Sequence, residues 1–184
     1  SSASHTEYNK LSKIGEPARD HVIEQSTIIN LSDKLSADGR LTAQLPQGNW
    51  TIMRFGYTAT GTTNIPPTKE GRGLEVDKFS REAFKVHYDA YVTNVINKVN
   101  EVAPGVMHSL EIDSYEVGGQ NWTQGYGQQF KAQYGYDLLK LMPLFSGKFI
   151  DSSQTTEQVL WDIRNLNNQL IVENYYNYFR KNLN

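Results

Sequence analysis

From Leu74 onward the chain alternates short apolar runs with longer stretches of helical periodicity. The runs at 74–77 and 107–112 alternate apolar and polar residues with the period of two that is typical of strands. The stretches 80–99 and 152–179 carry apolar residues at steps of three and four, which is the spacing of one helix face. Strands that alternate with helices are typical of a parallel sheet, so this order predicts an α/β fold.

The amino-terminal part has a different pattern. Residues 1–21 are polar and irregular, and short strand-like runs follow at 27–31, 41–45 and 50–57. Asp38-Gly39 lies between two of these runs and is a typical hairpin turn. We therefore expect residues 1–56 to be an irregular leader with short β-strands, the edge of a β-domain that leads into residues 57–184.

Length limits the second part. Residues 58–73 are rich in Gly, Pro and Thr, which predicts a long loop, and helices are expected at 125–134 and, cut by Pro143, at 136–145. A closed (β/α)8 TIM-type barrel takes ~250 residues. Only about 110 residues follow Leu74. The predicted fold is a β-rich lead-in segment followed by the first βα units of such a barrel, which is incomplete in this chain.

Composition excludes several classes of partner. The formal net charge is −2 and basic residues are scattered, so nucleic acid is not expected. No apolar run approaches the ~18 residues of a membrane span, and residues 1–6 lack the regions of a signal peptide. Cysteine is absent, which excludes disulfides and thiolate metal sites.

Acids, glycines and an aromatic residue directly follow the strand-like run 107–112. In an α/β barrel the carboxyl ends of strands hold the catalytic side chains, so Glu116 is a candidate for sugar cleavage. Gly118 and Gly119 leave room for a ligand near the backbone. Asp113 has three alternatives, namely holding a substrate hydroxyl, raising the pKa of Glu116 by repulsion, or capping the turn.

Two further groups are candidates for substrate binding. Glu75, Asp77 and Lys78 are charged and close together at a strand end, which fits a sugar-hydroxyl or calcium-binding corner. The alternative is surface pairing of Asp77 with Lys78 or Arg81. Asn121 and Trp122 fit a hydrogen-bonding and stacking rim for a sugar, or else a helix entry with Asn121 or Thr123 as cap.

Histidine and serine chemistry is not indicated. His87 lies in the apolar stripe of the helix 80–99, which favours a partly buried helix residue over a catalyst. Ser114 lacks the Gly-x-Ser-x-Gly pattern of a nucleophile elbow.

Five stretches, in order, resemble glycoside hydrolase family 106, the α-L-rhamnosidases. They are LTAQLPQGNWTIMRFGY (41–57), GLEVDK (73–78), IDSYEVGGQNWT (112–123), YGYD (134–137) and ENYY (173–176). One stretch alone would be weak evidence for the family, but the five in this order are fairly specific to it. Family members are much longer, so the resemblance implies the amino-terminal part of a catalytic barrel and the β segment before it.

The resemblance implies an inverting, calcium-assisted exo-enzyme that removes terminal L-rhamnose from plant-type polysaccharides or glycosides. It identifies Glu116 as the general acid and places the base on a later barrel strand, beyond this chain. It also implies a periplasmic or secreted bacterial parent protein and calcium in the full-length protein, for which the sequence assigns no ligands. The chain by itself is expected to be inactive.

Two alternatives belong to other classes of function. One is a non-catalytic carbohydrate-binding protein with the same fold. The other is a scaffold segment whose exposed barrel edges pair with the remainder of the parent barrel or with a second copy of the chain.

Overall fold

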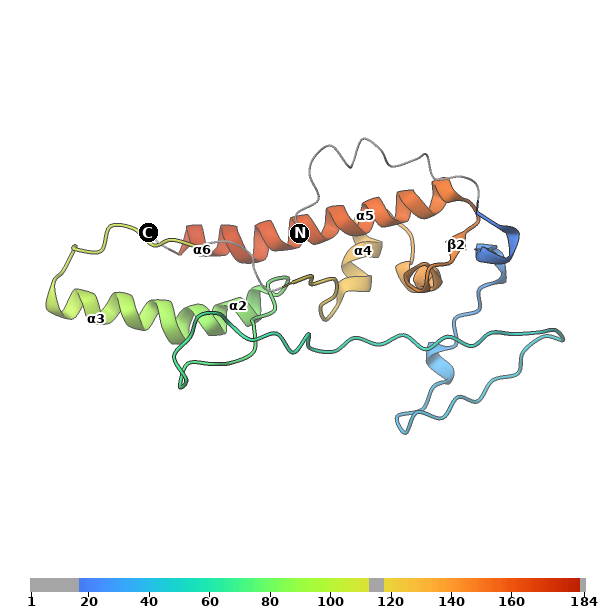
Figure 1. Ribbon diagram of the computed structural model, residues 1–184, viewed down its shortest axis with the longest axis horizontal. Coiled ribbons are helices and arrows are strands. Elements are labelled where there is room, and N and C mark those ends of the chain that lie inside the picture. Colours follow the sequence, from blue (N-terminus) through green and yellow to red (C-terminus); the bar gives the residue numbers. More distant parts are fainter. Residues whose placement is uncertain (1–16, 113–117, 183–184) are drawn as a thin grey trace. The chain divides into compact units, whose positions relative to one another are not determined.

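The computed structural model describes residues 17–112 and 118–182 (Figure 1). They belong to two compact units. The first unit comprises Ser1–Phe55 and Gly127–Asp162, and the second comprises Gly56–Tyr126 and Ile163–Asn184. Each unit therefore combines two segments that are distant in the sequence.

The first unit contains short elements around a two-stranded parallel sheet. Strand β1 (Val22–Ile23) pairs with β2 (Phe149–Ile150), with Val22 opposite Phe149 and Ile23 opposite Ile150. The other elements are η1 (Arg19–His21), η2 (Gln25–Thr27), η3 (Ser32–Lys34), most of α4 (Tyr126–Tyr134), η5 (Leu138–Ser146) and the first part of α5 (Ser153–Ile171).

The core of the first unit lies where α4, η5 and β2 place apolar side chains. Phe130, Leu138 and Ile150 are completely buried. The inward-facing helix predicted at 125–134 is confirmed by α4, and the turn after it has Gly135 at φ +82°. A polar contact also fixes the segment at Gln25, because the Asp151 carboxylate accepts a hydrogen bond from the Gln25 backbone amide at 2.7 Å.

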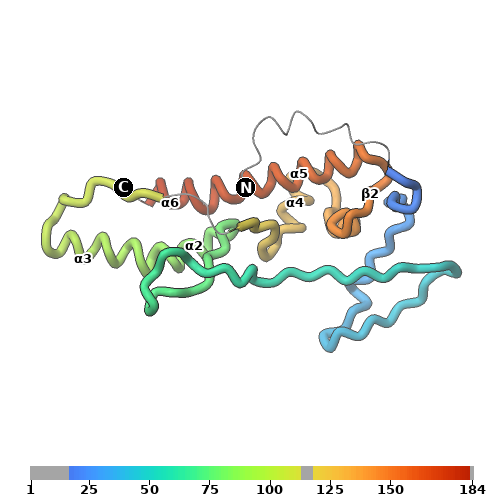
Figure 2. The backbone as a smooth tube through the Cα atoms, in the orientation of Figure 1, coloured from blue at the N-terminus to red at the C-terminus, as the bar shows by residue number. Residues whose placement is uncertain are grey.

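A small hairpin follows η3, as Asp38-Gly39 predicts. Leu35 and Leu41 form an antiparallel bridge, the Ser36 amide donates to the Arg40 carbonyl at 2.9 Å, and Gly39 has φ +83°. The predicted strands at 27–31, 41–45 and 50–57 are wrong for this structure, which has no ladder there beyond that bridge. Figure 2 shows extended chain after the hairpin. An alternating run becomes a strand only where a second strand supplies its hydrogen bonds.

The second unit is built from two helical rods. One comprises α2 (Arg81–His87), the π-helical turn η4 (Tyr88–Thr93) and α3 (Asn94–Val102), and the other comprises the end of α5, η6 (Val172–Tyr176) and α6 (Asn177–Lys181). Both helical predictions, 80–99 and 152–179, are confirmed. The start at Ser80 is explained by its side chain, which accepts the Ala83 amide at 3.1 Å as an N-cap.

Aromatic rings hold these rods together. The Phe84 ring meets those of Tyr175 and Tyr178 edge-on at centroid distances of 4.6 and 5.7 Å, and Tyr88 meets Phe179 at 5.8 Å. Such pairs are worth about 0.5–1.5 kcal/mol each beyond the area that they bury. The tyrosine supply of the carboxyl-terminal helix is thus used in packing.

The described residues are mostly helical and do not form a TIM barrel. The strand predicted at 74–77 is reduced to one antiparallel bridge between Leu74 and Thr63, which closes the base of the predicted loop, and residues 107–112 are not a strand. A barrel strand needs neighbours on both sides, and the described chain supplies only this antiparallel bridge to the first run and no strand partner to the second. Within 17–112 and 118–182, no helix is long and apolar enough to cross a bilayer.

Candidate functional site

Asp77 lies at the centre of a hydrogen-bonded corner in the second unit. Its Oδ1 accepts the Phe79 amide at 3.0 Å and the Gln120 side-chain amide, and its Oδ2 accepts the Thr123 hydroxyl at 2.6 Å. The Gln120 carbonyl oxygen in turn accepts the Lys78 backbone amide at 3.1 Å. We call Glu75, Asp77, Lys78, Gln120 and Thr123 the Asp77 corner. It joins two segments more than 40 positions apart in sequence.

Lys78 is a buried cation within this corner. Its ammonium lies 2.5 Å from the Glu75 carboxylate, with side-chain exposures of 7% for Lys78 and 20% for Glu75. The same ammonium lies 5.5 Å from the centroid of the Tyr175 ring, within cation–π range. The alternative considered for these charges paired Asp77 with Lys78 or Arg81; the ion pair in the structure joins Lys78 to Glu75.

Aromatic rings adjoin the corner. The half-buried Trp122 ring packs on the fully buried Tyr126 at a centroid distance of 4.7 Å and lies 6.3 Å from Tyr57, which is 64% exposed. Asn121 is exposed to solvent. The Thr123 hydroxyl donates to Asp77 at 2.6 Å, and the Thr123 carbonyl accepts the Tyr126 amide at 3.2 Å where α4 begins.

The two acids of the predicted catalytic motif, Asp113 and Glu116, lie outside the described residues. On either side of them the chain is described. Ile112 is half-buried, and Gly118 has φ +78°, a conformation that glycine adopts without strain. The described part of the motif that the structure brings to the corner is Gln120 to Thr123.

Carboxylates of the Asp77 corner do not fit a calcium ion. Glu75 is neutralised by Lys78, and both oxygens of Asp77 accept hydrogen bonds from the protein. Calcium takes 6–8 oxygen ligands with free lone pairs. In the part of the chain that the structure describes, no group of three or more His, Asp or Glu residues is placed to hold a metal.

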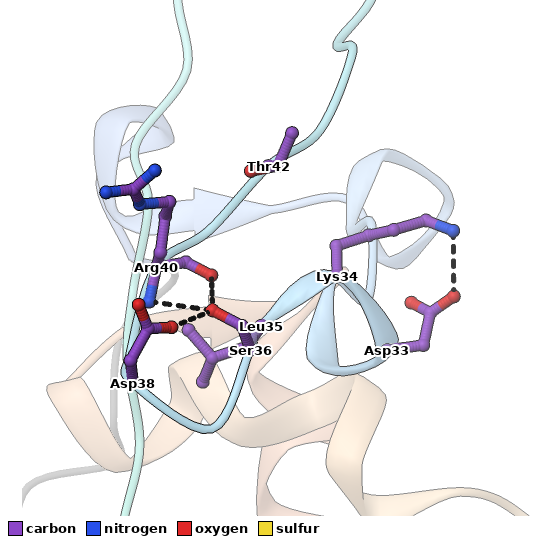
Figure 3. Close-up of a pocket in the computed structure, with 7 residues that line it drawn as sticks. All are labelled: Asp33, Lys34, Leu35, Ser36, Asp38, Arg40 and Thr42. Carbon is purple, nitrogen blue, oxygen red and sulfur yellow. Dashed lines mark hydrogen bonds and ion pairs between the residues drawn. The ribbon is translucent and has the colours of Figure 1, made fainter.

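A concave surface lies on the hairpin of the first unit (Figure 3). This hairpin pocket has a volume of about 510 Å³ and is lined by Asp33, Lys34, Leu35, Ser36, Asp38, Arg40 and Thr42. Lys34 pairs with Asp33 at 3.1 Å, and a hydrogen bond from the Ser36 hydroxyl lowers the pKa of Asp38. Lys34 and Asp38 are thus each met by a sequence neighbour on an exposed turn, and no predicted site residue lies there.

Some residues were placed differently from expectation, and others were not foreseen. His87 is exposed, although its ring still lies against Tyr91 at 6.1 Å and Phe84 at 6.2 Å. Gln120 and Thr123 were not predicted to bond Asp77. A glutamine or a threonine alone does not indicate such a contact. Their position close to Trp122 in the sequence was the available signal.

Comparison with known proteins identifies relatives of the whole chain. Glycoside hydrolase family 106, described as alpha-L-rhamnosidase, matches residues 1–184. A protein of Formosa agariphila named "Putative beta-glucuronidase" is 40% identical over 159 residues, which is 86% of this chain and 14% of that protein. The structure of a rhamnosidase from Novosphingobium sp. PP1Y aligns with a TM-score of 0.67 and 28% identity over 85% of this chain and 15% of that one. The chain thus spans about a seventh of the length of these relatives.

Proposed function

Because the chain belongs to the α-L-rhamnosidase family of glycoside hydrolases, we propose that it supplies the proton donor and part of the sugar site of an enzyme that removes terminal α-L-rhamnose. The family match over all residues carries this proposal. The order of GLEVDK at 73–78 before IDSYE at 112–116 supports it, as do the hydrogen bonds that join Asp77 to Gln120 and Thr123, just after the second motif.

Glu116 is the proposed general acid. As the bond between the anomeric carbon and the leaving oxygen breaks, the Glu116 carboxyl gives its proton to that oxygen. A water attacks the anomeric carbon from the opposite face, and a second carboxylate takes the proton of that water. An inverting enzyme holds the two carboxyl groups ~6.5 to 9.5 Å apart. We place the base in the longer polypeptide, on a later strand of a (β/α)8 barrel of which 57–184 is the first part.

The proposed sugar contacts are Asp113, Glu75, Lys78, Asn121 and Trp122. Trp122 offers a half-buried ring and Asn121 an exposed amide, which suit the apolar face and the hydroxyls of a sugar. The charge of Lys78 is compensated by Glu75. That balance favours a neutral sugar such as rhamnose over a uronic acid, the substrate class in the name of the Formosa relative.

The acid assignment is tested in the complete polypeptide with Glu116→Gln. General acid catalysis is worth about 10²–10⁴-fold. The variant should lose that factor on a natural rhamnoside with a poor leaving group and much less on an aryl α-L-rhamnoside with a good one. Glu111→Gln, at an exposed acid five positions earlier, is the matched control and should retain activity. Equal activity of Glu116→Gln and wild type on the natural rhamnoside refutes the assignment.

Substrate class is tested with paired aryl glycosides. The complete polypeptide should hydrolyse the α-L-rhamnoside and leave the β-D-glucuronide intact. Hydrolysis of the β-D-glucuronide but not of the α-L-rhamnoside would instead indicate a uronic acid as the substrate class. Rhamnose binding by calorimetry without turnover of either substrate would favour the non-catalytic carbohydrate-binding alternative.

Calcium and a periplasmic or secreted location are further proposals that the family resemblance supports. Pairing of the chain with the rest of the barrel or with itself is a separate proposal, which rests on the exposed edges of an incomplete barrel. Calcium is checked by chelation and re-addition, with activity and thermal unfolding as readouts. Self-association of the 184-residue chain is checked by sedimentation, where a clean monomer contradicts it. No step proposed above depends on calcium.

A further inference from the structure

The Asp77 carboxylate is occupied by hydrogen-bond donors of its own chain and is not left open for a ligand. It accepts from the Phe79 amide at 3.0 Å, from the Thr123 hydroxyl at 2.6 Å and from the Gln120 amide. An ionised carboxylate has about four acceptor positions, so three are in use. Little capacity is left for a sugar hydroxyl.

These bonds fix the segment that follows the predicted catalytic motif. Gln120 is held from both ends of its side-chain amide, since its nitrogen donates to Asp77 and its oxygen accepts the Lys78 amide at 3.1 Å. Thr123 is buried and bound at 2.6 Å. Hydrogen bonds to a charged group are stronger and shorter than neutral ones. The backbone between Gln120 and Thr123 is therefore fixed at both ends.

Trp122 lies between those two fixed positions. One side of its ring packs on Tyr126, which is fully buried and whose hydroxyl lies 2.6 Å from the Asn167 side chain. The Tyr57 ring lies 6.3 Å away, tilted by 36° to the Trp122 ring, and is 64% exposed. Trp122 and Tyr57 thus form a pair of neighbouring rings with a rigid support beneath the first of them.

We propose that Tyr57 and Trp122 form a platform for the apolar face of a bound sugar, and that Asp77 is a positioning residue that fixes this platform through Gln120 and Thr123. The inference rests on the proposed function, because that function supplies the class of ligand. It adds Tyr57 to the proposed sugar site. It also gives Asp77 the role of supporting the residues that contact the sugar, in place of contacting the sugar itself. Flat rings stack on sugars through their apolar faces, so the platform needs orientation more than charge.

The test measures affinity for L-rhamnose by calorimetry in the complete polypeptide. Trp122→Ala and Tyr57→Ala should each weaken binding by about tenfold, the loss expected for one stacked ring. Asp77→Asn and Thr123→Val should weaken it by about three- to tenfold, because each removes one support of Trp122. Thr123→Ser keeps the hydroxyl and should restore binding. Asp89→Asn, at an exposed acid of the same unit, is the control.

Coupling between variants separates positioning from direct contact. If Asp77 acts through Trp122, the double variant Asp77→Asn/Trp122→Ala should bind no more weakly than Trp122→Ala alone. Hydrogen exchange should rise in peptides covering 118–126 of Asp77→Asn and stay unchanged in 94–102. Additive losses of affinity would show that Asp77 contacts the sugar itself. Equal binding by Thr123→Val and Thr123→Ser would contradict the role of the Thr123 hydroxyl in supporting Trp122.

Failure of the inference is distinguishable from failure of the proposed function. A wild-type protein that hydrolyses an aryl α-L-rhamnoside while every platform variant retains its affinity keeps the function and overturns the platform. A wild-type protein that neither binds rhamnose nor hydrolyses the rhamnoside overturns both.

Discussion

The Asp77 corner and the hairpin pocket use the same kinds of side chain in opposite surroundings. Each contains a lysine–carboxylate pair and a hydroxyl that bonds an aspartate. In the hairpin pocket, Lys34 and Asp33 are 54% and 71% exposed, whereas Lys78 and Glu75 are 7% and 20% exposed. Hydrogen bonds in the pocket join neighbours in sequence, whereas the bonds of Gln120 and Thr123 to the Asp77 segment span 42 to 46 positions.

This difference shows that burial and sequence separation, and not residue type, determine what a charged cluster contributes. An exposed ion pair is screened by water and is worth about 0–1 kcal/mol. Removing one member of a buried ion pair costs much more stability, because the other charge stays buried without its counter-charge. Variants of the Asp77 corner should therefore have larger effects than variants of the hairpin pocket.

The largest effect is expected from Glu75→Ala. It leaves the Lys78 ammonium buried without its carboxylate, which typically costs about 3–5 kcal/mol. Hydrogen exchange in peptides covering 74–80 of the complete polypeptide measures this as a lower free energy of local opening. Asp33→Ala, the matched deletion in the hairpin pocket, should leave exchange in 30–42 unchanged. Equal responses of the two regions would contradict the comparison.

A smaller effect is expected from Tyr126→Phe. The change removes a buried hydroxyl that lies 2.6 Å from the Asn167 side chain, and net hydrogen bonds of this kind contribute about 0.5–1.5 kcal/mol. Exchange protection of 118–126 should fall by the corresponding factor. Tyr57→Phe, at a residue that is 64% exposed, serves as the control and should leave exchange protection unchanged. An unchanged Tyr126→Phe protein would show that the bond is not formed.

The smallest effect is expected in the hairpin pocket, and it depends on pH. The Ser36 hydroxyl, followed by the Arg40 backbone, lowers the pKa of Asp38 below its ordinary value of 3.8. A lowered pKa in the folded state favours folding above the ordinary value, and that contribution is lost as pH falls through the lowered one. Ser36→Ala should raise the pKa of Asp38 toward 3.8, measured by NMR titration of its carboxyl. An unmoved pKa would contradict the hydrogen bond.

Helices and turns were predictable because their determinants are local. The stripe of apolar residues from Phe84 to Val99 defines a helix by its spacing, Ser80 caps it, and Asp38-Gly39 turns a hairpin whatever lies around it. These signals lie within a few residues of the structure that they specify. The same reasoning correctly gave the buried faces of α4 and α5.

Strands and site contacts were not predictable to the same degree. The runs at 50–57 and 107–112 have strand periodicity, yet neither forms a ladder in the described chain, because a strand depends on partners elsewhere. Charges at 75–78 identified a polar corner, but the pairings considered from the sequence joined Asp77 to Lys78 or Arg81, whereas the structure pairs Lys78 with Glu75. That difference depends on Gln120 and Thr123, which reach Asp77 from another segment.

By itself, the sequence determined the family and the motif of the proposed acid, through short ordered stretches such as GLEVDK at 73–78, together with the helices and caps. Only the tertiary structure decided that Asp77 supports the segment of Trp122 and that Glu75 neutralises Lys78. The physical reason is that a motif is read along one segment, whereas a buried carboxylate takes its donors from whichever segments the fold brings within about 3 Å.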